Sequence, residues 1–237
     1  MKKGWMRIMS VLASILFLLF LLALLISLVG TSYDAYSREN EALNTAKRTG
    51  MSEYDLNYVT DRLTTYLRDG GHLNMAVHID GELREVFNEK EKIHMEDVRA
   101  LFVMLRTAMF IAGIAFVLLA ACVLLLGKRR GLRTLTRCLF WSTIGLIVCI
   151  LLVALWALAD FTGFWSFFHT VFFTNDLWLL NPNTDILIQI MPQSFFQSLI
   201  TKIMTYYGLC IAVLLGCTGT WTLYWRKKRL RGEHIGV

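Results

Sequence analysis

The fold of this chain is decided first by Met9–Val29, MSVLASILFLLFLLALLISLV, a stretch without a single charged residue. About 20 apolar residues in a helix cross the hydrocarbon core of a bilayer, which is about 30 Å thick. Three further runs have a similar length and character: Thr107–Leu126, Leu139–Ala159 and Tyr206–Trp225. With an apolar content of 56%, these runs predict a mainly α, polytopic membrane protein with four transmembrane helices in a single membrane domain, 1–237.

The first run also has the features of a secretory signal, because Lys2, Lys3 and Arg7 precede it. Its apolar core is, however, longer than the roughly 7–15 residues of a signal peptide. Ser27–Gly30 is in addition a poor small-x-small cleavage site. We therefore expect residues 9–29 to remain as the first membrane anchor.

Basic residues gather in three places that indicate the topology. They are Lys2, Lys3 and Arg7 before the first run, Lys128, Arg129, Arg130, Arg133 and Arg137 between the second and third, and Arg226, Lys227, Lys228, Arg229 and Arg231 after the fourth. The positive-inside rule places all three in the cytoplasm, with a cytoplasmic loop at 127–138 and a tail at 226–237. The net charge of +6 thus predicts contact with lipid headgroups of the cell membrane, and no nucleic-acid partner.

The segment 31–105, between the first two helices, then lies outside the cytoplasm, with nine Lys or Arg against fourteen Asp or Glu. Ser52 has the spacing of a helix cap, and Gly70 ends the apolar periodicity that follows it. Asp80–Gly81 is a strong two-residue hairpin turn. Asn88 and Glu91 again have capping spacing and open a helix that leads into the membrane. These signals predict a small α+β extracytoplasmic insertion.

The second outer segment, 160–202, is too polar to span a bilayer and too apolar for an ordinary loop. A turn signal at Asn181–Asp185 and a break at Pro192 interrupt it. Its aromatic residues are typical of the membrane boundary. We expect a re-entrant or interfacial segment between the third and fourth helices.

No hydrolase or nucleotide-binding motif occurs, and no cysteine lies in either outer segment. No metal site, cofactor or obligate protein partner is predicted. Two histidines remain as candidates for acid–base chemistry. Asp97 lies three residues after His94, on the same helical face, where its carboxylate could orient the imidazole. His169 lies among aromatics, where desolvation keeps an imidazole neutral.

Each candidate also has a simpler interpretation. The face carrying His94 could be an exposed polar surface, and His169 could be an interfacial histidine with one buried hydrogen bond. Asp176, Asp185 and Asn181 are residue types that occupy turns. Arg99, with Arg106, could bind headgroups or only extend towards the membrane surface. Phe168 and Phe172 are interface anchors or acyl-chain contacts.

Two stretches resemble the lipoprotein intramolecular transacylase family of four-helix membrane proteins in Gram-positive bacteria. The first is His94-Met95-Glu96-Asp97-Val98-Arg99. The second runs from Phe168-His169 through Asn175-Asp176-Leu177-Trp178, Asn181-Pro182 and Asp185 to Pro192 and Phe195-Phe196. The resemblance covers essentially the whole chain, including the large first outer segment.

The resemblance implies an acyltransferase of the cell membrane whose substrate is a diacylglyceryl-modified lipoprotein. The sn-2 acyl chain would move from the glycerol oxygen to the N-terminal α-amine, giving an N-acyl lyso-lipoprotein. His94 is then expected as the general base, oriented by Asp97, and His169 as the oxyanion donor, although these two roles could be exchanged. Asp176 joins this catalytic set.

The resemblance also places the substrate in the second outer segment. The residues expected to bind it or to exclude water are Arg99, Asn175, Trp178, Asn181, Asp185, Phe168 and Phe172, with Phe196 beside them. Two other functions stay open: a metal-dependent membrane hydrolase, with His94, His169, Asp176 and Asp185 as ligands, and a non-enzymatic sensor that uses the acidic outer segment.

Overall fold

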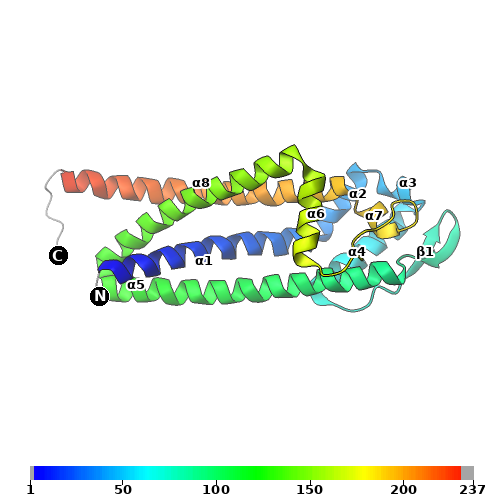
Figure 1. Cartoon of the computed structure of the whole chain (residues 1–237), viewed down its shortest axis with the longest axis horizontal. Coiled ribbons are helices and arrows are strands. Elements are labelled where there is room, and N and C mark those ends of the chain that lie inside the picture. Colours follow the sequence, from blue (N-terminus) through cyan, green and yellow to red (C-terminus); the bar gives the residue numbers. More distant parts are fainter. Residues whose placement is uncertain (1–2, 231–237) are drawn as a thin grey trace. The chain divides into compact units, whose positions relative to one another are not determined.

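The structure is a computed structural model that describes residues 3–230 (Figure 1). Its elements follow in the order α1 (Lys3–Gly30), α2 (Tyr33–Ala42), α3 (Thr45–Thr49), α4 (Glu53–Asp69), β1 (Ala76–Ile79), β2 (Glu82–Glu85), α5 (Glu89–Ala159), α6 (Phe161–Phe172), α7 (Ile186–Ile190) and α8 (Gln193–Leu230). They form two compact units. The first is built from the chain up to Leu24, from Thr107–Phe161 and from Thr205 onward, and the second from Leu25–Arg106 and Thr162–Met204.

The first unit consists of the apolar parts of α1, α5 and α8. Phe17 of α1 packs on Phe116 of α5 with ring centroids 4.9 Å apart. The Tyr207 hydroxyl of α8 donates to the Leu18 carbonyl of α1 at 3.0 Å. Most side chains in the apolar windows of these helices are nevertheless uncovered by protein. A helix that is apolar all round and uncovered requires an apolar solvent, which a lipid bilayer provides.

Three helices of the described residues are long and apolar enough to cross a membrane, and α5 contains both the second and the third predicted run. At 1.5 Å per residue its 71 residues amount to about 100 Å, several times the hydrocarbon thickness. The residue with non-helical backbone angles inside α5 is Lys128 (φ 48°, ψ −134°), and the chain reverses its direction there (Figure 1).

The segment 127–138, which the sequence led us to expect as a loop, is helical on both sides of Lys128, so that expectation is wrong for the backbone. The tight reversal depends on Gly131, where an added Cβ would lie 2.1 Å from the Val123 carbonyl oxygen. A charged sequence of this kind is typical of a loop, yet its backbone hydrogen bonds are better satisfied by continued helix.

The second unit contains the short helices and strands, and its helix caps and its hairpin turn form where the sequence predicts them. The Ser52 side chain accepts from the Asp55 N–H at 3.0 Å at the start of α4, and Gly70 closes that helix with a φ of 91°. Strands β1 and β2 pair antiparallel around the Asp80–Gly81 turn. The helices α2 and α3 were not expected from the sequence pattern.

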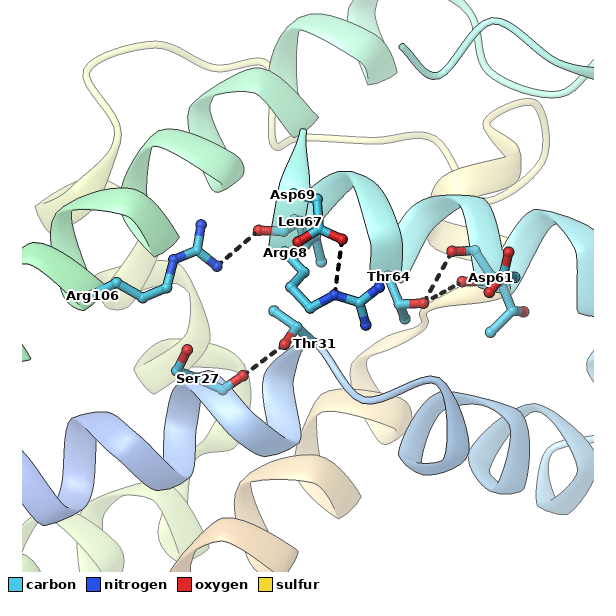
Figure 2. A network of polar contacts seen from close by, with 9 residues as sticks. Ser27, Thr31, Asp61, Thr64, Leu67, Arg68, Asp69 and Arg106 are labelled. Atoms are coloured by element: carbon cyan, nitrogen blue, oxygen red, sulfur yellow. Dashed lines mark hydrogen bonds and ion pairs between the residues drawn. The ribbon is translucent and has the colours of Figure 1, made fainter. Parts of the chain in front are cut away.

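Buried side chains of α4, of the hairpin and of the segment that follows it into α5 form the core of this unit. Nearly fully buried residues of this group are Leu56, Val59, Leu63, Leu67, Val77, Ile79, Val86, Phe87 and Met95. The carboxyl end of α4 is joined to α5, where Arg106 donates to the Leu67 carbonyl at 3.2 Å (Figure 2). The first part of α5, residues 89–106, which precedes Thr107 and the apolar run, thus belongs to the second unit.

Candidate functional site

The second unit brings His94 and His169 together although 75 residues separate them in sequence. His94 lies in the second turn of α5, and His169 lies near the end of α6. Their ring centroids are 6.2 Å apart. Both are buried, with exposed fractions of 7% and 5%. A pair of buried imidazoles is unusual enough to mark a candidate functional site.

The ring of His169 is held in one tautomer by the helix that carries it. Its Nδ1 lies 2.8 Å from the Trp165 carbonyl oxygen, one turn earlier. A carbonyl only accepts, so Nδ1 carries the proton and Nε2 keeps its lone pair. Burial lowers the pKa of His169, and the hydrogen bond to Trp165 opposes that shift because it stabilises the imidazolium. His169 is therefore neutral, with an oriented basic nitrogen.

His94 is shifted further in the same direction. Burial, followed by the neighbouring His169, lowers its pKa from 6.5 to about 4, and the opposing charge of Asp97 is a smaller effect. Its Nδ1 is buried with no hydrogen-bond partner among the residues that the structure describes. A buried polar nitrogen without a partner costs about 1–3 kcal/mol. This imidazole is thus neutral at physiological pH and has a nitrogen left over for a ligand.

Aromatic side chains surround the two rings. Trp178 stacks on His169 with centroids 4.6 Å apart, and Phe168 meets its edge at 5.4 Å. Phe173 contacts both histidines, at 5.3 Å from His94 and 5.5 Å from His169. Phe168 and Trp178 were predicted from the sequence, whereas Trp165 and Phe173 were missed. Their spacing of four residues on either side of His169 is the signal that could have found them.

Asp97 is tied to the second outer segment. Its carboxylate accepts a hydrogen bond of 2.9 Å from Nδ2 of Asn175, and Oδ1 of Asn175 accepts from the Leu177 N–H at 3.1 Å. The structure thus brings two predicted site residues together, from α5 and from the loop after α6. This bridge fixes the loop that carries Trp178 against the helix that carries His94.

A second bridge lies one turn before His94. Glu91 is 1% exposed and accepts from the N–H groups of Asn88, at 2.7 Å, and Leu187, at 2.6 Å. Asn88 in turn donates to Asp185 at 3.1 Å. Burial raises the pKa of Glu91, and the two backbone N–H groups oppose this shift. The sequence pattern indicated only the helix cap in Asn88 and Glu91, because Leu187 is distant in sequence.

The remaining predicted residues lie around this centre. Asp185 is 7% exposed and accepts from the Asn181 N–H at 2.7 Å, so both belong to the turn before α7. Asp176 is exposed, and in the described residues no contact joins its carboxylate to either histidine. Phe172 is 47% exposed and contacts Phe168 at 4.8 Å.

Arg99 points to α4 and not to the histidines. Its guanidinium lies over the Tyr66 ring at 5.6 Å and so close to Gly70 that an added Cβ would meet it at 2.4 Å. Phe196 contacts Trp165, with ring centroids 4.5 Å apart. Among residues 3–230, no group of three or more His, Cys, Asp or Glu side chains is placed to hold a metal ion.

A neutral histidine with an oriented lone pair, beside a second neutral histidine in an aromatic setting, can move a proton and stabilise a developing negative charge. Such groups serve acyl transfer, in which a nucleophile must lose a proton and a carbonyl oxygen gains charge. The aromatic setting limits the access of water, which is the competing nucleophile.

Comparisons with known proteins point to one family. The family described as lipoprotein intramolecular transacylase Lit matches residues 11–196. The chain is similar in fold to the membrane integral lipoprotein intramolecular transacylase Lit of Bacillus cereus. The TM-score is 0.70 and the identity 21%, over 97% of this chain and 100% of that one.

Two variants of the Bacillus cereus protein, each with one histidine replaced, are also similar to the chain. The arginine variant has a TM-score of 0.66 at 20% identity and covers 98% of this chain and 96% of its own. The alanine variant has a TM-score of 0.70 at 20% identity and covers 97% of each. Among curated proteins, no relative matched.

Proposed function

The chain belongs to the lipoprotein intramolecular transacylase family, and on this premise we propose the reaction and the roles of its residues. The substrate is a bacterial lipoprotein whose N-terminal cysteine carries diacylglycerol on its sulfur and has a free α-amine. The sn-2 acyl chain moves from the glycerol oxygen to that amine. Donor and acceptor belong to one molecule, so the protein mainly has to fold the headgroup into an attack geometry.

We propose that the reaction takes place on the outer face of the cell membrane. The three basic clusters favour cytoplasmic termini and a cytoplasmic α5 break, because Lys and Arg are enriched on that side. On this topology each half of α5 crosses once, and α1 and α8 supply two further crossings. The second unit, with both histidines, then lies where mature lipoproteins are exposed.

The single observation that carries the proposal is the pair of buried, neutral histidines. We assign the base to His169, exchanging the two roles that the sequence favoured. The Trp165 carbonyl orients its Nε2 and stabilises the imidazolium. The stronger shift of His94, to a pKa of about 4, makes it a weak base. A neutral imidazole of this kind suits the donor of an N–H to the oxyanion, as in isomerases that polarise a carbonyl with neutral histidine.

The steps balance without a further reactant. An α-amine with a pKa near 8 is about one tenth neutral at pH 7, and this neutral form attacks the sn-2 ester carbonyl. As the N–C bond forms, the nitrogen gives one proton to Nε2 of His169. The carbonyl oxygen takes up negative charge and is stabilised by the N–H of His94. As the C–O bond breaks, the imidazolium of His169 returns the proton to the leaving glycerol oxygen.

Asp97 and the aromatic side chains have supporting roles: Asp97 positions a loop of the site, and the aromatic rings exclude water. Through Asn175 the Asp97 carboxylate holds the loop that presents Trp178. Trp165, Phe168, Phe173 and Trp178 cover the histidines and would keep water from the ester. This matters because attack by water would release a fatty acid instead of moving it.

Mass spectrometry of the N-terminal lipopeptide tests the proposal. Cells that contain a diacyl lipoprotein and no other enzyme of this kind should give the N-acyl lyso-form only when this protein is expressed. Replacement of His169 by alanine should slow the conversion by about 100- to 10,000-fold, because a general base usually accelerates a reaction by that factor. Replacement of His94 should slow it by about 100- to 1,000-fold.

The matched control is His78→Ala, which removes an exposed histidine of β1 in the same unit and should leave the conversion unchanged. Full conversion by the His169→Ala or the His94→Ala protein, at equal amounts in the membrane, would refute the assignment. A deacylated product with a free α-amine would show instead that the protein is a hydrolase.

A further inference from the structure

A cavity of about 570 Å³ with both polar and apolar lining residues lies within the first unit, at the end where α5 reverses. Arg7 of α1 lines it, together with Arg133 and Arg137 of α5. Arg133 and Arg137 are four residues apart and so share one face of the helix. Thr134 and Ser142 also line the cavity. The three arginines make this wall rich in hydrogen-bond donors and positive charge, which suits an anion.

Among the described residues of the first unit, almost no acidic side chain is present to balance these arginines. In the described part of the first unit, eleven Lys or Arg residues stand against one acidic residue, Asp160. Asp160 lies 23 residues beyond Arg137 on the same helix, about 35 Å away along its axis. That distance exceeds the screening length of about 8 Å at physiological salt. The described residues of the unit therefore supply no anion to the cavity.

One of the three arginines is already fixed in place. The Arg133 guanidinium lies over the Trp225 ring of α8 at 4.2 Å. Its Nε is buried and has no hydrogen-bond partner in the part of the chain that the structure describes. A buried guanidinium nitrogen without a partner is costly, and stacking on an aromatic ring leaves the remaining N–H groups free to bind an anion. The cavity is thus partly organised before a ligand enters.

Apolar tracks lead away from the arginines along both helices. On α1, Val11, Ile15 and Leu19 follow Arg7 at spacings of four and are 38%, 43% and 47% exposed. On α5, Trp141 is 59% exposed and Leu152 is 64% exposed, eleven residues apart and so on one face. A polar end joined to exposed apolar tracks matches a molecule with a charged headgroup and long acyl chains, and not a free ion.

We propose that this cavity binds the phosphate of an anionic phospholipid, with Arg7, Arg133 and Arg137 on the headgroup and the acyl chains along α1 and α5. Basic pockets between transmembrane helices are the usual sites for such headgroups. The site belongs to the first unit, and it does not depend on the histidine chemistry of the second. It would anchor the reversal of α5 to one leaflet of the membrane.

Native mass spectrometry of the delipidated full-length protein tests this site. Dioleoyl phosphatidylglycerol is titrated against dioleoyl phosphatidylcholine, and inorganic phosphate forms a third arm. Each arginine in contact with the bound headgroup contributes a factor of about 5 in affinity. The double replacement Arg133→Gln/Arg137→Gln should therefore weaken phosphatidylglycerol binding about 25-fold. Phosphatidylcholine should bind weakly to all proteins.

The matched control is Arg129→Gln/Arg130→Gln, which removes the same charge from the same region. Both side chains are exposed and outside the cavity lining, so binding should stay within about 2-fold of wild type. Arg137→Gln alone should lower the affinity about 5-fold. Because this side chain is exposed, the single variant should fold normally and so tests the site even if the double variant misfolds.

Equal losses in the double variant and in its control would overturn the proposal, since the effect would then be diffuse surface charge. Equal binding of phosphatidylcholine and phosphatidylglycerol would overturn it as well. Saturable binding of inorganic phosphate, with no further gain from phosphatidylglycerol, would assign the cavity to a free ion and overturn the lipid assignment.

Discussion

The burial of neutral His94 should make the stability of the protein depend on pH, and His94→Gln should remove that dependence. In the folded protein the pKa of His94 is about 4, against 6.5 for an ordinary histidine. Between these values the unfolded chain binds a proton that the folded chain does not. The contribution of neutral His94 to the free energy of unfolding is therefore fully present above about pH 6.5 and is lost as the pH falls towards 4.

The size of the effect follows from the shift. The pKa of His94 is lowered by about 2.5 pH units, and each pH unit is worth about 1.36 kcal/mol. The loss of stability is therefore limited to about 3.4 kcal/mol, which is reached below pH 4. Linkage gives about 2 kcal/mol of this loss at pH 5 and about 3 kcal/mol at pH 4. Carboxyl groups titrate in the same range, so the quantity to compare is the difference between wild type and variant.

The assay is unfolding of the detergent-solubilised protein by denaturant at pH 7, 5 and 4, with tryptophan fluorescence as the readout. The free energy of unfolding of wild type should fall by about 2 kcal/mol more than that of His94→Gln between pH 7 and 5. His78→Gln, which changes an exposed histidine on β1, should keep the wild-type dependence. Parallel curves for wild type and His94→Gln would refute the buried neutral histidine and with it the proposed oxyanion donor.

Three further changes test the surroundings of the site and the reversal of α5. Glu91→Ala should lower the free energy of unfolding by about 1–3 kcal/mol, because the buried Leu187 N–H loses its acceptor and the part-buried Asn88 N–H loses its acceptor too, as denaturant unfolding would show. Trp178→Ala should uncover His169 and raise the ratio of released fatty acid to transferred acyl chain in the lipopeptide assay, whereas Phe172→Ala, at an exposed ring, should not. Gly131→Ala should destabilise the protein in thermal unfolding by several degrees, because its Cβ would meet a main-chain oxygen at 2.1 Å, whereas Gly145→Ala meets nothing within 4 Å and should be neutral.

Features encoded within a few residues could be predicted from the sequence. The cap at Ser52, the reciprocal cap of Asn88 with Glu91 and the Asp80–Gly81 turn all form as their residue types dictate. Each depends on hydrogen bonds between neighbours, so distant parts of the chain hardly alter it. The helix through 127–138 was missed for the opposite reason, because charge clusters report membrane topology and not backbone geometry.

The sequence identified candidate residues of the site, but it did not predict which of them contact one another. His94, His169 and Asp97 were identified from the sequence, yet Asp97 was assigned to His94, whereas the folded chain joins its carboxylate to Asn175. Asp176 was also expected among the catalytic residues, and the structure leaves that side chain exposed. Such outcomes depend on how α6 and the following loop pack on α5, and helical spacing carries no information on that packing.

By itself, the sequence determined the apolar runs that require a lipid solvent, the charge clusters that favour one orientation and the residue types able to do acid–base chemistry. These features follow from solvation and from local hydrogen bonding, and both depend only on residues that are close together in sequence. Only the tertiary structure decided that two histidines 75 residues apart share one aromatic setting. It also decided that Trp165 fixes the tautomer of His169 and that three arginines line one cavity. The physical reason is that burial and pairing depend on contacts between distant segments, and these contacts set the pKa values on which the chemistry depends.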